Sequence, residues 1–204
     1  VMLTVVTNRL LCKEAFLERI GRIASACPDR ILLREKYLTE QEYLLLAKEC
    51  KRICDCYQVE LMLHSHLRIA REIGTASVHL PYHSFLESIN EISAFDTVSV
   101  SVHSVEEACS VEEMGGNSII AGHIFPTVCK KNIPPRGVDY LQSVCAAVKI
   151  PVHGIGGINL QNYGAVQKAG AVGICVMSEL MACAEPERLI ASYKRRSCDL
   201  APEK

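Results

Sequence analysis

Short apolar runs alternate with longer segments of helical spacing along the whole chain. Each run holds four or five residues rich in Val, Ile or Leu, and such runs predict β-strands. The eight predicted strands lie at residues 3–7, 30–34, 59–63, 77–80, 97–101, 118–121, 151–154 and 173–177. Eight strands that alternate with helices are typical of either a closed (β/α)8 barrel or a doubly wound open sheet.

Three helix starts can be read directly from the sequence. Thr39 with Glu42, and Ser104 with Glu107, have the spacing of a capping box, in which hydroxyl and carboxylate satisfy free backbone N–H groups reciprocally. Pro186 predicts another start, because proline lacks the N–H that has no partner in the first helical turn. These starts place helices between the strands, as either architecture requires.

Two features favour the closed barrel over the open sheet. Eight βα units are the number that closure requires, and the last two strands lead into turns of small residues, at 154–157 and 177–178. In barrels these two loops commonly bind phosphate. We therefore predict a single α/β domain, a compact (β/α)8 TIM barrel over residues 1–204, with its functional site at the carboxyl ends of the strands.

Composition narrows the range of partners. The chain has 22 Lys and Arg against 23 Asp and Glu, a net charge of −1, so it lacks the basic excess typical of proteins that bind nucleic acid or anionic membranes. Apolar residues make up 49% and aromatic residues only 5%, which predicts a full aliphatic core. With neither a leader segment nor a run of membrane-spanning length, we expect a cytoplasmic protein with no membrane or nucleic-acid partner.

Eleven cysteines raise the question of disulfides or metal. Their odd number and the position of many inside apolar runs indicate small buried side chains in a reducing compartment. Cys50 and Cys54 are one helical turn apart, and no second ligand pair stands at zinc-site spacing. The sequence therefore predicts no metal site here.

Polar residues at the strand ends supply the candidate chemistry. Arg34 and Lys36 follow the second strand, where two cations hold an anion or belong to a solvated loop. His64 follows the third strand in a His-x-His pair, which without a convergent carboxylate indicates a polar wall rather than a metal site. Ser101 and His103 stand at the end of the fifth strand.

The loop after the sixth strand is the most informative segment. His123 leaves the strand directly, and Thr127, Lys130 and Lys131 follow it. This composition suits an anion held beside a group that exchanges protons near neutral pH, although a lone histidine is often only a packed structural residue. The turn at 154–157 lacks dinucleotide-fingerprint spacing, and its glycines instead let backbone N–H groups approach a phosphate where the next helix begins.

Taken in order, five stretches resemble the thiamine phosphate synthase superfamily, whose members are (β/α)8 barrels. They lie at residues 33–36, 78–80, 99–108, 122–130 and 154–158. The resemblance implies a magnesium ion that binds pyrophosphate through two aspartates, but these positions hold Ser65 and Ser84 here. A serine hydroxyl is a poor substitute for a carboxylate at Mg²⁺.

Within the superfamily, the Gly-His pair at 122–123 and the Cys-Lys-Lys run at 129–131 most resemble the TenI-type thiazole tautomerase branch. The resemblance predicts an isomerase that moves one proton on a carboxythiazole phosphate, with His123 as acid/base, without metal or other cofactor. The phosphorylated thiazole would be its small-molecule partner, and a homodimer is implied. The predicted binding residues are Arg34, Lys36, His64, Ser101, His103, Thr127, Lys130, Gly156, Gly157, Met177 and Ser178.

Two alternatives remain open from the sequence. One is a working thiamine phosphate synthase with rearranged metal ligands, such as His64 or His83, and only this alternative brings in magnesium. The other is a non-catalytic protein that binds a thiazole phosphate or has a regulatory role. Its near-neutral charge argues against direct DNA binding.

Overall fold

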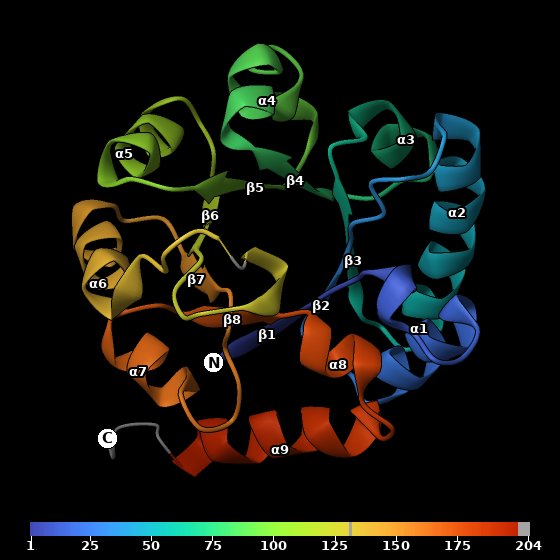
Figure 1. The fold of residues 1–204 in the computed structure, drawn as a ribbon. Helices are drawn as coiled ribbons and strands as arrows, with labels where there is room; N and C mark the ends of the chain where they lie inside the picture. The colour runs from blue at the N-terminus through green and yellow to red at the C-terminus, as the bar shows by residue number, and fades with distance from the viewer. Residues whose placement is uncertain (131, 200–204) are drawn as a thin grey trace.

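Eight parallel strands close into a barrel in sequence order, surrounded by a ring of helices (Figure 1). The computed structural model describes residues 1–130 and 132–199, with side chains through residue 195. The strands are β1 (Met2–Val6), β2 (Arg30–Leu33), β3 (Glu60–His64), β4 (Ser77–Pro81), β5 (Thr97–Val102), β6 (Ser118–Gly122), β7 (Val152–Ile155) and β8 (Gly173–Val176). The predicted TIM barrel is confirmed, and the open sheet is excluded because β1 pairs with β8.

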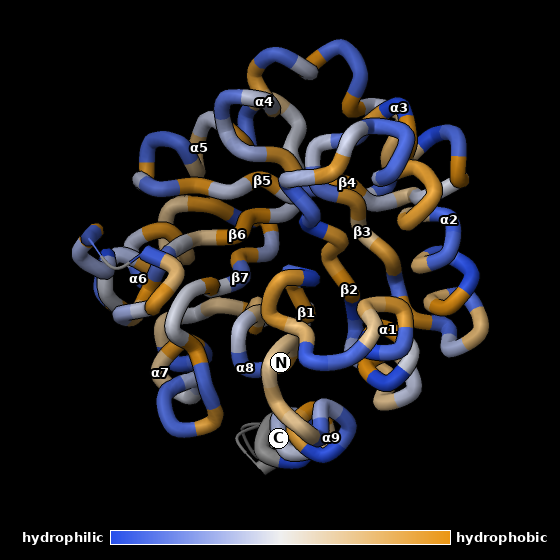
Figure 2. Tube along the Cα trace, turned by 45° about the vertical axis from the view of Figure 1, so that its right-hand side comes forward, coloured by the Kyte–Doolittle hydropathy of each residue, from blue (hydrophilic) through white to orange (hydrophobic). Residues whose placement is uncertain are grey.

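The helices cover the outside of the barrel. They are α1 (Phe16–Ser25), α2 (Glu40–Cys56), α3 (Leu67–Glu72), α4 (Tyr82–Glu87), α5 (Val105–Glu113), α6 (Gly137–Ala147), α7 (Tyr163–Lys168), α8 (Ser178–Ala182) and α9 (Pro186–Asp199). Three 3₁₀ turns, η1 (Arg9–Leu11), η2 (Ile92–Ala94) and η3 (Val128–Lys130), complete the described elements. Figure 2 shows apolar strands inside and polar residues on the outer faces of the helices.

The predicted helix starts are confirmed with one change. Thr39 and Glu42 form the complete capping box of α2, and α9 begins at Pro186. At α5, Ser104 Oγ accepts from the N–H of Glu107 at 3.1 Å, as predicted. The Glu107 carboxylate, however, accepts from the N–H of His103 at 2.6 Å, one residue earlier than a capping box requires. This hydrogen bond connects the end of β5 to the first turn of α5.

The two cysteines one helical turn apart belong to the apolar packing of the barrel. Cys50 and Cys54 are fully buried on the inner face of α2. Every cysteine whose side chain is described is free, and the described residues hold no group of three His, Cys, Asp or Glu able to bind a metal. Two further predictions concern other parts of the chain. In the described part of the chain, no helix is both long and apolar enough to cross a membrane. Lys131, which the sequence placed beside Lys130, lies outside the described residues.

The barrel closes tightly between β7, β8 and β1. A Cβ on Gly173 would lie 2.9 Å from both Nε2 of His153 and the carbonyl oxygen of Met2, so this position has no room for a side chain. Toward the carboxyl ends of the strands, the barrel interior is filled by a small apolar layer that includes Val6, Leu32 and Met62.

Below this layer, the amino-terminal end of the barrel interior is polar. Arg30 Nη2 lies 2.8 Å from Glu60 Oε2, and the Ser77 hydroxyl donates to the same carboxylate. His153 is 2% exposed. Burial, reinforced by the charge of Arg30, lowers the pKa of His153 to about 4.

This buried histidine predicts a loss of stability in acid. An unfolded histidine binds a proton below about pH 6.5, whereas folded His153 stays neutral down to about pH 4. Over that range the unfolded state gains the proton, so each such histidine lowers the free energy of unfolding by about 1.4 kcal/mol per pH unit. Urea unfolding between pH 7 and pH 4 measures this slope.

The His153→Gln variant should show a slope shallower by about that amount. His83→Gln is the matched control, because His83 lies on the surface with its side chain 84% exposed. A slope that is the same in wild type and His153→Gln would contradict the assignment.

Candidate functional site

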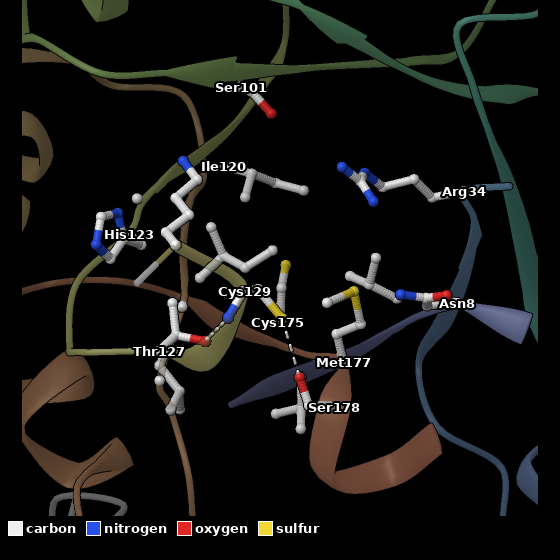
Figure 3. Close-up of a pocket in the computed structure, with 18 of the residues that line it drawn as sticks. Asn8, Arg34, Ser101, Ile120, His123, Thr127, Cys129, Cys175, Met177 and Ser178 are labelled. Carbon is white, nitrogen blue, oxygen red and sulfur yellow. Dashed lines mark hydrogen bonds between the residues drawn. The ribbon is translucent and has the colours of Figure 1, made fainter. Parts of the chain in front are cut away.

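A cavity of about 790 Å³ opens at the carboxyl ends of the strands (Figure 3). Eleven of the twelve predicted site residues line it. They are Arg34, His64, Ser101, His103, His123, Thr127, Lys130, Gly156, Gly157, Met177 and Ser178. Strand ends far apart in the sequence therefore converge on one space, and its size suits a small-molecule site.

Arg34 is presented to the cavity by a hydrogen-bonded joint between β1 and β2. Its backbone N–H donates to Thr7 Oγ1 at 3.0 Å. The Thr7 hydroxyl donates to Glu35 Oε1 at 2.7 Å, and the same carboxylate oxygen accepts from the N–H of Arg9 at 3.1 Å. Glu35 is 6% exposed. Although it stands between Arg34 and Lys36 in the sequence, its carboxylate is buried and hydrogen-bonded to Thr7 and Arg9. Burial lowers the pKa of Arg34.

Lys36 and Lys130 extend this positive region. Lys36 is exposed and, unlike the other predicted residues, is not part of the cavity lining. The charge of Arg34, followed by burial and by Lys130, lowers the pKa of Lys36. Burial and then the charges of Arg136 and Arg34 lower the pKa of Lys130. The structure shows no ion pair between these cations and any described acidic side chain, so their charge is available to a ligand.

A neutral polar wall runs along β3, β4 and β5. His79 is fully engaged, with Nδ1 3.0 Å from Ser99 Oγ and Nε2 2.7 Å from Ser101 Oγ. Burial holds the pKa of His79 well below its ordinary value. Burial, followed by the charges of Arg34 and Lys36, lowers the pKa of His64 to about 3. Both imidazoles are therefore uncharged at neutral pH.

His123 lies beneath the long loop that follows β6. Its side chain is buried, and Nε2 lies 3.2 Å from the carbonyl oxygen of Ile133, to which it must donate. The N–H of Arg136 donates to the carbonyl oxygen of His123 at 2.9 Å. In Figure 3 the ring lies at the edge of the cavity, turned away from its middle. The catalytic role of His123 stays a prediction, and its visible contacts hold the loop that carries Lys130.

The glycine turn after β7 packs directly against that loop. Gly156 and Gly157 have φ angles of 99° and 66°, and a Cβ on Gly157 would lie 2.8 Å from Phe125 Cβ. Phe125 N–H donates to the Gly156 carbonyl oxygen at 3.0 Å. The expectation that a helix begins directly after this turn is wrong. The amide of Asn162 binds the Gly157 carbonyl oxygen at 2.8 Å, and α7 begins only at Tyr163.

Some lining residues were not predicted. Asn8 lies two residues after the end of β1, so the rule that function lies at strand ends identifies it, although the motifs do not. Cys129 Sγ lies 3.4 Å from Ser178 Oγ and joins the β6 loop to the β8 turn. No sequence pattern indicates this contact, because the two residues are 49 positions apart.

Residues suited to bind magnesium are absent from the described part of the cavity. Ser65 is exposed and its hydroxyl lies 2.8 Å from His64 Nδ1, while Ser84 lies in α4; neither lines the cavity. Glu179 is the one acidic residue among the lining residues, and it accepts a hydrogen bond from the Tyr193 hydroxyl at 2.7 Å. Magnesium prefers several hard anionic oxygens, so this donor set does not fit the ion.

A (β/α)8 barrel with a glycine turn and cations at this mouth is typical of enzymes that bind phosphorylated small molecules. The chain belongs to the thiamine monophosphate synthase family, whose pattern it matches over residues 3–180.

Several relatives match nearly the whole chain. A protein of Streptococcus pneumoniae named thiamine-phosphate synthase 2 is 29% identical over 197 residues, covering 95% of this chain and 94% of the relative. The thiamine-phosphate synthase of Pyrococcus horikoshii is 30% identical, covering 95% and 93%. Among solved structures, thiamine phosphate pyrophosphorylase from Pyrococcus furiosus has a TM-score of 0.84 and 25% identity, covering 98% of this chain and 96% of that one.

These findings correct the predicted branch. The expected tautomerase, an isomerase, is wrong, because the matching relatives are named as synthases, which are transferases. The prediction gave too much weight to Ser65 and Ser84. These residues bear on how the metal would be bound, whereas the similarity over the whole chain bears on the reaction.

The glycine turn predicts different outcomes for two alanine substitutions. Gly157→Ala adds a Cβ at positive φ against Phe125 and should destabilise the protein by about 1–3 kcal/mol. Gly21→Ala, in α1 with open space around it, should instead stabilise by up to about 1 kcal/mol. Thermal unfolding of both variants checks this, and a Gly157→Ala variant as stable as wild type would refute the close packing.

Proposed function

We propose that the protein is a transferase of the thiamine-phosphate synthase type. It would join a pyrimidine-methyl diphosphate to a thiazole phosphate and release diphosphate. The observation that carries the proposal is one cavity lined by Arg34 after β2, Lys130 after β6 and a glycine turn after β7, in which neither cation is paired with a described acid. The names of the relatives that match almost the whole chain support this reaction.

The bonds that break and form in this reaction show what the cavity has to provide. The bond between the pyrimidine methylene carbon and the diphosphate oxygen breaks, and diphosphate leaves with the electron pair. The thiazole ring nitrogen then uses its lone pair to form the new bond to that carbon. This nitrogen carries no hydrogen, so no proton has to be removed. The main requirement is to stabilise negative charge as it develops on the leaving group.

The two ends of the cavity suit the two anionic groups. Arg34 and Lys130, with Lys36 exposed outside the lining, would hold the diphosphate through charge-assisted hydrogen bonds. The turn at Gly156 and Gly157 and the hydroxyl of Ser178 would take the thiazole phosphate. The rings would then lie beside the neutral wall of β3, β4 and β5, where uncharged imidazoles add no positive charge to the reacting carbon.

His123 would position the loop in this reaction. Its ring binds the carbonyl oxygen of Ile133, three residues beyond Lys130, and its own carbonyl accepts from Arg136. Losing the ring should release the loop and weaken the hold of Lys130 on diphosphate. The magnesium implied by the family resemblance does not fit the described residues, so no step is assigned to it.

Formation of thiamine phosphate from the two substrates tests the proposal. Purified protein should produce it, and Arg34→Gln should lower kcat/KM for the pyrimidine substrate by about 100-fold, because a charge-assisted contact to the leaving group is lost. Lys149→Gln is the matched control, an exposed cation between α6 and β7 that does not line the cavity. No product from folded wild-type protein, with or without Mg²⁺, would overturn the proposal.

The positioning role of His123 has its own signature. His123→Ala should raise KM for the pyrimidine diphosphate about tenfold and change kcat less, because loop order affects binding first. His123→Gln retains an N–H donor for Ile133 and should recover most of that loss. If both variants lose kcat equally and KM is unchanged, His123 acts on the reacting groups instead.

A further inference from the structure

Positive charge at the mouth exceeds negative charge among the described residues, because Arg34 and Lys130 line the cavity beside one acid, Glu179, which accepts a hydrogen bond from Tyr193. Arg34 and Lys130 line the cavity, Lys36 is exposed outside the lining, and none of the three is ion-paired to a described carboxylate. Glu35, which stands between Arg34 and Lys36 in sequence, is buried against Thr7 and Arg9 instead. No described carboxylate forms an ion pair with these three cations, and the charge of Glu35 offsets only part of the effect by which burial lowers the pKa of Arg34.

Arg34 and Lys130 line the same cavity, and Lys36 follows Arg34 by two residues, so the three cations lie near one another. The charge of Arg34, followed by burial and by Lys130, lowers the pKa of Lys36, while burial, followed by Arg136 and Arg34, lowers the pKa of Lys130. Such a cluster is electrostatically unfavourable until an anion enters it. A ligand group with several negative charges relieves this repulsion, and a diphosphate has enough oxygens to contact all three side chains.

A metal-bridged diphosphate would need the opposite arrangement. Magnesium holds a phosphate by adding its own positive charge, and protein carboxylates keep the ion in place. Here the lining carboxylate, Glu179, is bonded to Tyr193, and Ser65 is bonded to His64. A divalent ion would enter a region that is already cationic, where the described lining offers one carboxylate, already bonded to Tyr193, and otherwise neutral donors.

We propose that the cavity takes up a diphosphate group as the free anion, with its charge balanced by Arg34, Lys36 and Lys130 and without a divalent cation. The proposal rests on the proposed function, because that function supplies a ligand with a diphosphate. It goes beyond that function by assigning to side chains the charge that the family resemblance assigns to a metal.

Calorimetric titration with inorganic pyrophosphate tests this inference directly. Binding should be measurable in EDTA. Adding excess Mg²⁺ should leave the affinity unchanged or weaken it, because the ion competes with the protein for the same oxygens. At a metal-dependent site the sign is reversed, and Mg²⁺ tightens binding. Raising the salt concentration should weaken binding in either buffer, since the contacts are ionic.

Variants connect the binding to the named cations. Arg34→Gln and Lys130→Gln should each weaken pyrophosphate binding in EDTA by about tenfold or more, and Lys149→Gln should not change it. Thermal unfolding of each variant establishes that it is folded. Tightening by Mg²⁺ of tenfold or more, the absence of binding in EDTA, or unchanged affinity in both cavity variants would overturn the inference.

The synthase assay in the same two buffers separates this inference from the proposed function. Pyrophosphate binding in EDTA without thiamine phosphate formation in either buffer would leave the inference standing and remove the function. Product formed only with Mg²⁺, together with pyrophosphate binding only with Mg²⁺, would support the function and overturn the inference. Product and pyrophosphate binding in EDTA together would support both.

Discussion

Closure of the sheet between β1 and β8 is the constraint on which the rest of the structure depends. The register pairs Met2 with Gly173 and Val5 with Val176, so the first and last strands share a ladder of backbone hydrogen bonds. Closure leaves no strand edge unpaired. It also brings the end of β2 opposite the loops of β6 and β7, although these segments are far apart in sequence. Without closure the cations and the glycine turn would not share one cavity.

The fold could be predicted from the sequence because its signals are local. Each strand is a short apolar run, and the observed bounds differ from the predicted ones by about one residue. The capping box of α2 forms because Thr39 and Glu42 need only each other. At α5, Glu107 binds the N–H of His103 instead, since the course of the chain out of β5 decides which donor is in reach. Spacing alone does not determine that choice.

The candidate site could be predicted less completely, for a related reason. The rule that function lies at the carboxyl ends of strands holds, because nearly all the predicted site residues line the cavity. Whether a residue at a strand end lines the cavity or stays exposed outside the lining, as Lys36 does, depends on the local path of the loop. The contact between Cys129 and Ser178 depends on two loops meeting across the mouth. Such contacts follow from tertiary structure, and no spacing rule reveals them.

The branch assignment failed through a different kind of error. The motif at 122–123 and the serines at 65 and 84 are local differences, and we interpreted them as a change of reaction. Similarity along 95% of the chain points to the synthases instead. A few local differences at strand ends can change how charge is balanced while the scaffold remains.

The inward turn of Glu35 has a kinetic consequence. A protein with a net charge of −1 exerts little overall attraction on an anion. By moving one carboxylate from the rim into the joint between β1 and β2, the fold separates the opposite charges of neighbouring residues in space. The mouth then has a local potential opposite in sign to the net charge. Such focusing guides an approaching anion to the opening and raises its association rate, even though the molecule as a whole is nearly neutral.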